Sequence, residues 1–285
     1  MRTTAANWRK PLQWNAQPFF ECEACHWRGA DPIRTQAGGV YCRKCTMDVI
    51  EPARRRVFCA SLADVFDNEV DPQWRRDLFD LIRATPRLTW LLLTKRIGIA
   101  RRLFDECHMD PPDGGSGYPW PENVWLGATI CDQTEADRDI PKLLAVPARV
   151  RFLSIEPMLG PVDLALRCEN WSDDIVMDPE TGLRECCRDC DYTGVGNAIE
   201  WVICGGESGP QARDFNIAWP RSIVAQCKAA GVPVHVKQMG ARPVWSNDPD
   251  DGSEPPHWGR ISYIDKSGGD PGEWPADLRV QEFPA

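Results

Sequence analysis

The stretch Ile199-Glu200-Trp201-Val202-Ile203-Cys204-Gly205-Gly206-Glu207-Ser208-Gly209-Pro210 decides how the rest of this sequence is interpreted. Its first part is mainly apolar or aromatic, which is typical of a strand buried on both faces of a parallel sheet. The two glycines permit a sharp turn or a close approach to a ligand. A carboxylate and a hydroxyl follow where the strand ends, which is where α/β folds bind ligands. The alternative is a tight turn followed by a solvated glutamate.

Strands and helices alternate through the middle of the chain. Short apolar runs predict strands at 57–60, 90–93, 124–128, 150–153, 199–203 and 234–236, and helical apolar spacing predicts helices at 72–84, 97–107, 133–146 and 217–230. This alternation implies parallel strands joined by right-handed crossovers. A complete barrel of the TIM type has eight such units. We therefore predict an α/β fold, an incomplete or partial TIM-type (β/α) barrel of about six parallel strands, in preference to a doubly wound sheet.

The composition divides the chain into four parts. Residues 1–18 have too little periodicity to predict an element and are expected to be an extended lead-in. Residues 19–50 form a cysteine-bearing insertion, and residues 54–240 form the barrel-like domain, interrupted by a second cysteine-bearing insertion at 167–198. Residues 241–285 are rich in Pro, Gly and Asp and are expected to wrap the surface with little regular structure.

Two C-x2-C pairs, Cys22/Cys25 and Cys42/Cys45, are separated by 16 residues. Each pair forms a tight knuckle that presents two thiolates, and four thiolates complete a tetrahedral zinc site. We predict a zinc ribbon over residues 19–50. Four-thiolate coordination leaves no open position, so the zinc is expected to be structural rather than catalytic.

The second insertion repeats the knuckle pattern in a less complete form. Cys187 and Cys190 make another C-x2-C pair, with Cys186 beside it and Cys168 upstream. Either Cys168, Cys187 and Cys190, with or without Cys186, form a second metal site, or the segment is a decayed knuckle in a loop.

Composition limits the cellular setting and the partners. The chain has 285 residues, thirteen cysteines and a net charge of −9, with neither a secretory signal nor an apolar run long enough to cross a membrane. Cysteines without a secretory signal indicate a reducing compartment, so we expect a cytoplasmic protein. The negative charge argues against a protein that coats nucleic acid, but a local basic patch at Arg54-Arg55-Arg56 or Lys95-Arg96 remains compatible with nucleic-acid binding. A solvated arginine run is the alternative for the first patch.

Polar residues follow each predicted strand, which would bring them to one shared rim. The catalytic candidates are Asp64, Lys95, Glu156 and Glu207. The candidates for substrate binding are Ser61, Arg96, Gly205, Gly206, Ser208, Lys237 and Gln238. Neighbouring carboxylates and lysines shift each other's pKa values and can divide acid and base roles. A Lys–Glu pair can equally brace the fold.

Several blocks together give the sequence a family resemblance: the blocks from Val57 to Phe66, Leu92 to Arg96, Arg151 to Pro157 and Gly205 to Pro210, and the pair Lys237-Gln238. In this order they resemble the phage and prophage protein family of unknown function named after gene products 37 and 68. The resemblance covers about residues 5–16, 54–166 and 199–240. It implies a barrel like that of radical S-adenosylmethionine enzymes and, if the protein is phage-encoded, the host cytoplasm.

Members of that family usually carry a three-cysteine motif upstream of the segment that here reads Ala5-Ala6-Asn7-Trp8. The chain starts after that position, and its ribbon cysteines have the wrong spacing to replace the motif. We therefore expect no iron–sulfur cluster in the chain as given; either the natural start lies upstream or cluster chemistry has been lost. Ile97 and Ile130-Cys131-Asp132 are further departures from the family pattern.

The chain also resembles barrel enzymes that exchange guanine for a 7-deazaguanine in tRNA, and their phage relatives acting on DNA. Those enzymes use a Gly-Gly strand end and a structural zinc, and an aspartate attacks the sugar. The resemblance implies base exchange with a small-molecule base, for which Asp64 is the leading candidate nucleophile or general base. The first hypothesis is thus a nucleobase-modifying enzyme, acting by base exchange or by radical chemistry if an upstream cluster motif exists. The second is a non-catalytic zinc-containing module that binds nucleic acid or protein.

Overall fold

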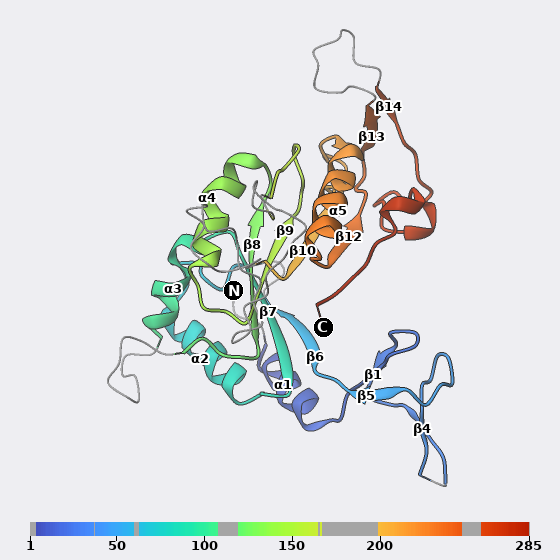
Figure 1. Ribbon diagram of the computed structural model, residues 1–285. Helices are drawn as coiled ribbons and strands as arrows, with labels where there is room; N and C mark the ends of the chain where they lie inside the picture. Colours follow the sequence, from blue (N-terminus) through green and yellow to red (C-terminus); the bar gives the residue numbers. More distant parts are fainter. Residues whose placement is uncertain are drawn as a thin grey trace, which may run out of the picture. The chain divides into compact units, whose positions relative to one another are not determined.

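The computed structural model describes residues 4–36, 38–59, 63–107, 119–164, 166, 199–246 and 258–284 (Figure 1). They fall into two compact units. The N-terminal unit comprises Met1–Leu92 and Ile99–Trp125, and the C-terminal unit comprises Leu93–Gly98 and Leu126–Ala285. The predicted insertion at 167–198 lies outside the described residues.

The main sheet has six strands in the order β12-β10-β9-β8-β7-β6. Their bounds are β6 Arg55–Cys59, β7 Leu88–Thr94, β8 Val124–Ile130, β9 Val150–Ile155, β10 Trp201–Gly205 and β12 Val234–Gln238. The pairs β6/β7, β9/β10 and β10/β12 are parallel. The order follows the sequence without a reversal, whereas a doubly wound sheet reverses at its switch point. The predicted α/β class with six parallel strands is confirmed.

Four helices occupy the predicted intervals: α2 (Pro72–Arg83), α3 (Ile97–Asp105), α4 (Gln133–Leu144) and α5 (Ala218–Ala230). Their ends follow local chemistry. Asp71 accepts a hydrogen bond from the Gln73 amide at the start of α2, and Gly231 ends α5 at φ 68°. Within the described ranges, no helix has the combination of length and apolar character needed to cross a membrane.

The core explains why the strands have continuous apolar runs. Every residue of β8 and of β10 is buried. Gly127 in β8 makes room for its neighbour, because a Cβ there would lie 2.4 Å from the Phe152 ring. In the C-terminal unit, α5 contacts both β10 and β12 (Figure 1). A strand with both faces covered is expected to be apolar at almost every position.

The expectation of an extended lead-in is wrong, because α1 spans Ala5–Ala16. The Thr4 hydroxyl accepts from the Asn7 amide, a normal helix start. Pro11 lies inside the helix and is its one buried residue. The helix therefore lacks the wide apolar stripe that periodicity detects, and its interior proline argued against it.

The cysteine-bearing segment consists of short strands (in shades of blue in Figure 1). They are β1 (Phe20–Cys22), β2 (Arg28–Gly29), β3 (Ile33–Arg34), β4 (Val40–Tyr41) and β5 (Ile50–Pro52). The sheet β2-β1-β5 and the hairpin β3-β4 are antiparallel. These strands are too short to bury a core of their own.

The last part of the chain runs past strand β12. It contains β13 (Pro243–Ser246) and β14 (Trp258–Arg260), which with β11 (Phe215–Asn216) make a small sheet, and the short helices η1 (Pro271–Glu273) and η2 (Ala276–Leu278). The amide of Val236 donates to the carbonyl of Val280, and the amide of Glu282 donates to the carbonyl of Val234. These bonds cover the outer edge of β12, which would otherwise be open to pairing with another chain.

Candidate functional site

Four cysteines of the N-terminal unit converge in space. The Sγ atoms of Cys22 and Cys45 are 3.6 Å apart, those of Cys25 and Cys42 are 3.5 Å apart, and all four lie within 4.8 Å of one another. A disulfide would need about 2.05 Å. Zinc–sulfur bonds of about 2.3 Å place the sulfurs of a tetrahedral site roughly 3.8 Å apart. The geometry fits a four-coordinate metal ion.

The two C-x2-C segments have the same backbone geometry. The residue after each pair has a positive φ, 54° for His26 and 60° for Thr46. In each knuckle the carbonyl of the first cysteine accepts a hydrogen bond from the amide of the residue that follows the pair. The amide of the same cysteine donates to the carbonyl one residue farther along. These bonds are His26 to Cys22, Cys22 to Trp27, Thr46 to Cys42 and Cys42 to Met47, at 2.7–3.0 Å. Left-handed backbone at non-glycine residues is uncommon. Its repetition indicates that both loops are shaped to present sulfur.

The thiols differ in acidity. Burial opposes ionisation of Cys42, but hydrogen bonds from the Cys45 and Lys44 amides outweigh it and lower the pKa of Cys42 to about 6. The Met47 amide favours the Cys45 thiolate, yet burial and the neighbouring sulfurs raise the pKa of Cys45 to about 12. Holding all four side chains together as thiolates would need a cation, and a metal ion is able to supply that charge. The predicted four-cysteine site is confirmed as a group that can hold a metal. The predicted second group, Cys168, Cys187 and Cys190, lies outside the described residues.

A second cluster lies at the strand ends of the C-terminal unit. Lys237 Nζ donates to Glu156 Oε2 at 3.1 Å, and the Ser154 hydroxyl donates to the same oxygen at 3.4 Å. Glu156 follows β9 and Lys237 belongs to β12, the two strands that flank β10. The ion pair thus passes over the end of β10. A Cβ on Gly205 would lie 2.9 Å from Glu156 Oε1, so the glycine leaves space for this pair.

A bulge in β12 gives Lys237 its direction. Cys204 pairs with Val236 and Gly205 pairs with Gln238, so Lys237 is the extra residue. Bulges are frequent beside functional sites because they redirect a side chain. The Glu156 side chain is 15% exposed and that of Lys237 is 57% exposed. The carboxylate is therefore held inside, while the ammonium reaches it from the solvent side.

Backbone hydrogen bonds fix the strand ends to one another. The Leu159 amide donates to the Cys131 carbonyl and the Met158 amide donates to the Gly205 carbonyl. The Gly206 amide donates to the Gln238 carbonyl at 3.0 Å, and Gln238 Nε2 donates back to the Gly206 carbonyl at 2.8 Å. The ends of β8, β9, β10 and β12 are therefore positioned before any ligand arrives.

Glu207 is held by a residue that the sequence did not single out. Arg213 donates to both carboxylate oxygens through Nε at 2.9 Å and a terminal nitrogen at 3.1 Å, and its amide donates at 3.1 Å. These hydrogen bonds hold the pKa of Glu207 below its usual value. Glu207 is thus an ionised carboxylate with its acceptor sites occupied, better suited to fixing the 207–213 loop than to proton transfer.

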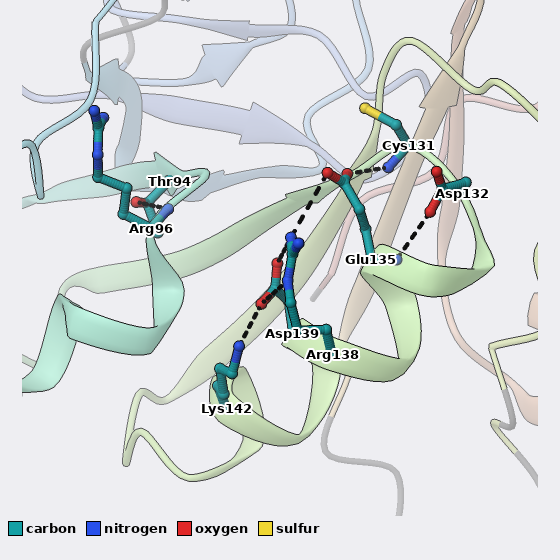
Figure 2. A network of polar contacts seen from close by, with 8 residues as sticks. All are labelled: Thr94, Arg96, Cys131, Asp132, Glu135, Arg138, Asp139 and Lys142. Carbon is teal, nitrogen blue, oxygen red and sulfur yellow. Dashed lines mark hydrogen bonds and ion pairs between the residues drawn. The ribbon is translucent and has the colours of Figure 1, made fainter.

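The end of β8 is shaped by helix α4 (Figure 2). The Asp132 carboxylate caps the Glu135 amide at 2.9 Å, and Glu135 Oε2 accepts from the Cys131 amide at 2.8 Å. Burial, with the charge of Glu135, raises the pKa of the Cys131 thiol to about 11, against the opposing effect of Lys95. Cys131 is thus a neutral thiol near Lys95, and not a ready nucleophile.

The same helix carries an ion-pair network farther along. Arg138 and Lys142 both bind the buried carboxylate of Asp139, at 2.6 and 2.9 Å, and Arg138 also approaches Glu135 at 3.6 Å (Figure 2). At the end of β7, the Arg96 amide donates to the Thr94 hydroxyl at 2.9 Å. The Asp139 network thus stabilises helix α4 itself, and the bond to Thr94 stabilises the turn after β7.

The remaining predicted residues are distributed as follows. Asp64 belongs to the N-terminal unit, where its carboxylate accepts from the Phe66 amide at 2.9 Å. Ser208 is exposed, and Ser61 lies outside the described residues. In the C-terminal unit the structure brings together Glu156, Lys237, Gly205 and Gln238. That Asp64 shares a pocket with Glu156 and Glu207 stays a prediction.

Comparison with protein families places the chain in one of them. The model of the family described as "Protein of unknown function (DUF5131)" matches residues 1–258. The chain belongs to this family. The matched span includes the four-cysteine group and the strand ends from β7 to β12. The description of the DUF5131 family names no activity.

No curated protein and no solved structure matches the chain.

Proposed function

We propose that this chain is a nucleobase-modifying enzyme that exchanges a base in nucleic acid at the strand ends of its C-terminal unit. The six-stranded sheet is then part of an incomplete barrel of the TIM type, a fold whose catalytic groups lie at the carboxyl ends of the strands. The four cysteines hold a structural zinc ion. Zinc favours four thiolates in a tetrahedron, and a closed set of four leaves no position for substrate.

The proposal rests on the hydrogen bonding of the Glu156 carboxylate. Its Oε2 accepts from Lys237 and Ser154, whereas its Oε1 is buried and has no hydrogen-bond partner among the described residues. A buried polar atom without a partner costs about 1–3 kcal/mol. A pair that serves only as a brace has no reason to leave one oxygen unsatisfied. The arrangement suits a carboxylate oxygen that accepts a hydrogen bond from an N–H group of a ligand, such as the edge of a purine.

In base exchange every bond that forms is matched by one that breaks. A carboxylate oxygen bonds to C1′ of the sugar while the bond from C1′ to the base nitrogen breaks, and the departing base takes up a proton. The incoming base then loses a proton and displaces the carboxylate, so no oxidant or reductant is consumed. Lys237 is placed to hold the carboxylate of Glu156 and to supply the proton. A duplex substrate requires the target nucleotide to be flipped out.

A second candidate function is a non-catalytic module that binds nucleic acid. The observation in its favour is charge: residues 4–59 contain nine Lys and Arg against five Asp and Glu, a net charge of +4 in a chain of net charge −9. Such asymmetry indicates contact with a polyanion. Turnover separates the two candidates, because a module binds nucleic acid without altering it.

Incorporation of radiolabelled guanine into DNA or tRNA by the zinc-loaded protein tests the proposed function. We expect incorporation by the wild type and a loss of about 100-fold or more in Glu156→Gln, because the amide cannot act as the carboxylate does. Asp277→Asn is the matched control, since Asp277 is a surface carboxylate paired with Arg221 in the same unit. No incorporation by the wild type into either nucleic acid contradicts base exchange, and incorporation by Glu156→Gln equal to that of the wild type contradicts the role given to Glu156.

A further inference from the structure

Arginine and aromatic side chains alternate in a stack within the N-terminal unit. The Arg55 guanidinium lies 5.4 Å from the centre of the Trp14 ring and 4.9 Å from that of Phe19, and Arg28 lies 5.7 Å from the centre of Phe19. We call Trp14, Arg55, Phe19 and Arg28 the guanidinium stack. These contacts fix the planes of two guanidinium groups, which lowers the entropy lost when they bind a ligand.

The stack is part of a wider group of positive charges. Arg28 donates to the Arg54 carbonyl at 2.6 Å, and the side chain of Arg54 is exposed. Burial, together with the charge of Arg28, lowers the pKa of the neighbouring Arg56 to about 10. Glu21 is ion-paired with Arg28 and is the acid that acts on Arg56. The guanidinium groups of Arg28 and Arg56 thus lie close enough to affect each other, and Arg28 also holds the backbone of Arg54.

A second arginine–aromatic pair joins strand β3 to strand β1. The exposed Arg34 of β3 lies 5.7 Å from the centre of the Phe20 ring. Phe19 and Phe20 are adjacent in the sequence, so the pair and the stack belong to the same short segment. Residues 4–59 also carry an excess of positive charge.

We propose that the guanidinium stack with Arg34 and Arg54 forms a surface that binds single-stranded nucleic acid. Arginine forks match phosphate oxygens in a bidentate manner. Aromatic rings and guanidinium planes also stack on exposed bases of any sequence, which is how single strands are held without readout. An acidic protein segment offers the charge but no planar bases, so the alternation of planar groups favours nucleic acid.

This inference deepens the proposed function, because it names the face through which the enzyme holds its substrate strand. The two remain separable. Binding by the stack does not require turnover, and the strand-end residues belong to the other compact unit.

Fluorescence anisotropy with a labelled 20-nucleotide single-stranded DNA of mixed sequence tests the inference, using the full zinc-loaded chain at 50–200 mM salt. The double variant Arg34→Gln/Arg54→Gln removes two exposed guanidinium groups and leaves the stack intact. We expect affinity to fall about tenfold or more at the lowest salt, and the dependence of log K on log salt to lose about 1.4, or 0.7 per lost phosphate contact. Arg55→Gln is expected to weaken binding further.

The matched control is Arg83→Gln, which removes an exposed arginine of the same unit that is paired with Asp80. It is expected to bind as the wild type does. Unchanged affinity and salt dependence in the double variant overturn the inference, as does equal, equally arginine-dependent binding of polyglutamate, which would indicate an acidic protein partner. Normal binding with no base exchange contradicts the proposed function alone. Base exchange with normal binding by the double variant contradicts this inference alone.

Discussion

Cys42→Ser/Cys45→Ser is expected to lose one equivalent of zinc and to unfold the cysteine-bearing segment from Phe20 to Pro52. The reason is that the described part of this segment has no hydrophobic core apart from the cysteines. Among the described residues of this segment, the buried apolar side chains are those of Cys22 and Cys42 themselves. Strands of two or three residues cannot offset their conformational entropy. Binding of a structural zinc contributes on the order of 10 kcal/mol, so metal binding and folding of this segment are one process.

Elemental analysis of protein purified without added metal measures the first effect, and hydrogen exchange measures the second. The amides of Cys22, His26, Cys42 and Thr46 are hydrogen-bonded and should exchange slowly in the wild type. They should exchange at the rate of an unfolded chain in the double variant and after chelation. Cys107→Ser, a change of a half-buried cysteine outside the group, should keep both metal and protection. Unchanged zinc content in the double variant would rule out this site.

Gly206→Ala is expected to destabilise the protein by about 3 kcal/mol or more, the upper end of the cost of overpacking. A Cβ at this position would lie 2.5 Å from the Met239 carbonyl oxygen and 2.9 Å from the Phe215 ring. The oxygen belongs to the backbone, and the Gly206 amide and carbonyl are both hydrogen-bonded to Gln238. Neither strand end can move without breaking the hydrogen bonds that join the ends of β10 and β12.

Chemical denaturation compares this variant with Gly160→Ala. Gly160 lies in the same unit, and a Cβ there meets no atom within 4 Å. The control should change the free energy of unfolding by less than about 0.5 kcal/mol, as surface substitutions usually do. Equal stability of the two variants would mean that Gly206 serves the ligand rather than the packing of the strand ends.

The alternation of elements could be predicted from the sequence because both faces of the parallel strands are buried. β8 and β10 are apolar at almost every position, and the helices between strands have apolar residues at helical spacing. Helix α1 could not be predicted, since it buries only Pro11 and so has no apolar stripe. Periodicity reports burial, and an element with little burial leaves little periodicity.

The candidate site was predictable in part for a related reason. Strand ends in a parallel sheet share an edge, so Glu156, Gly205 and Lys237 could be grouped without a structure. The partner of Glu207 could not, because Arg213 follows in a loop whose path no pattern fixes. Nor could the bulge at Lys237, which depends on the register between β10 and β12. Contacts set by loop path and register carry no periodic signal.

The most direct test of base modification is mass spectrometry of nucleosides from DNA and RNA of cells that produce the protein. Four samples are compared: no protein, wild type, Glu156→Gln and the surface control Asp277→Asn. We expect a modified nucleoside with the wild type and with Asp277→Asn, and its absence in the other two samples. Nucleoside profiles that are the same in all four samples, with the proteins present at equal levels, would contradict the assignment of this chain as a nucleobase-modifying enzyme.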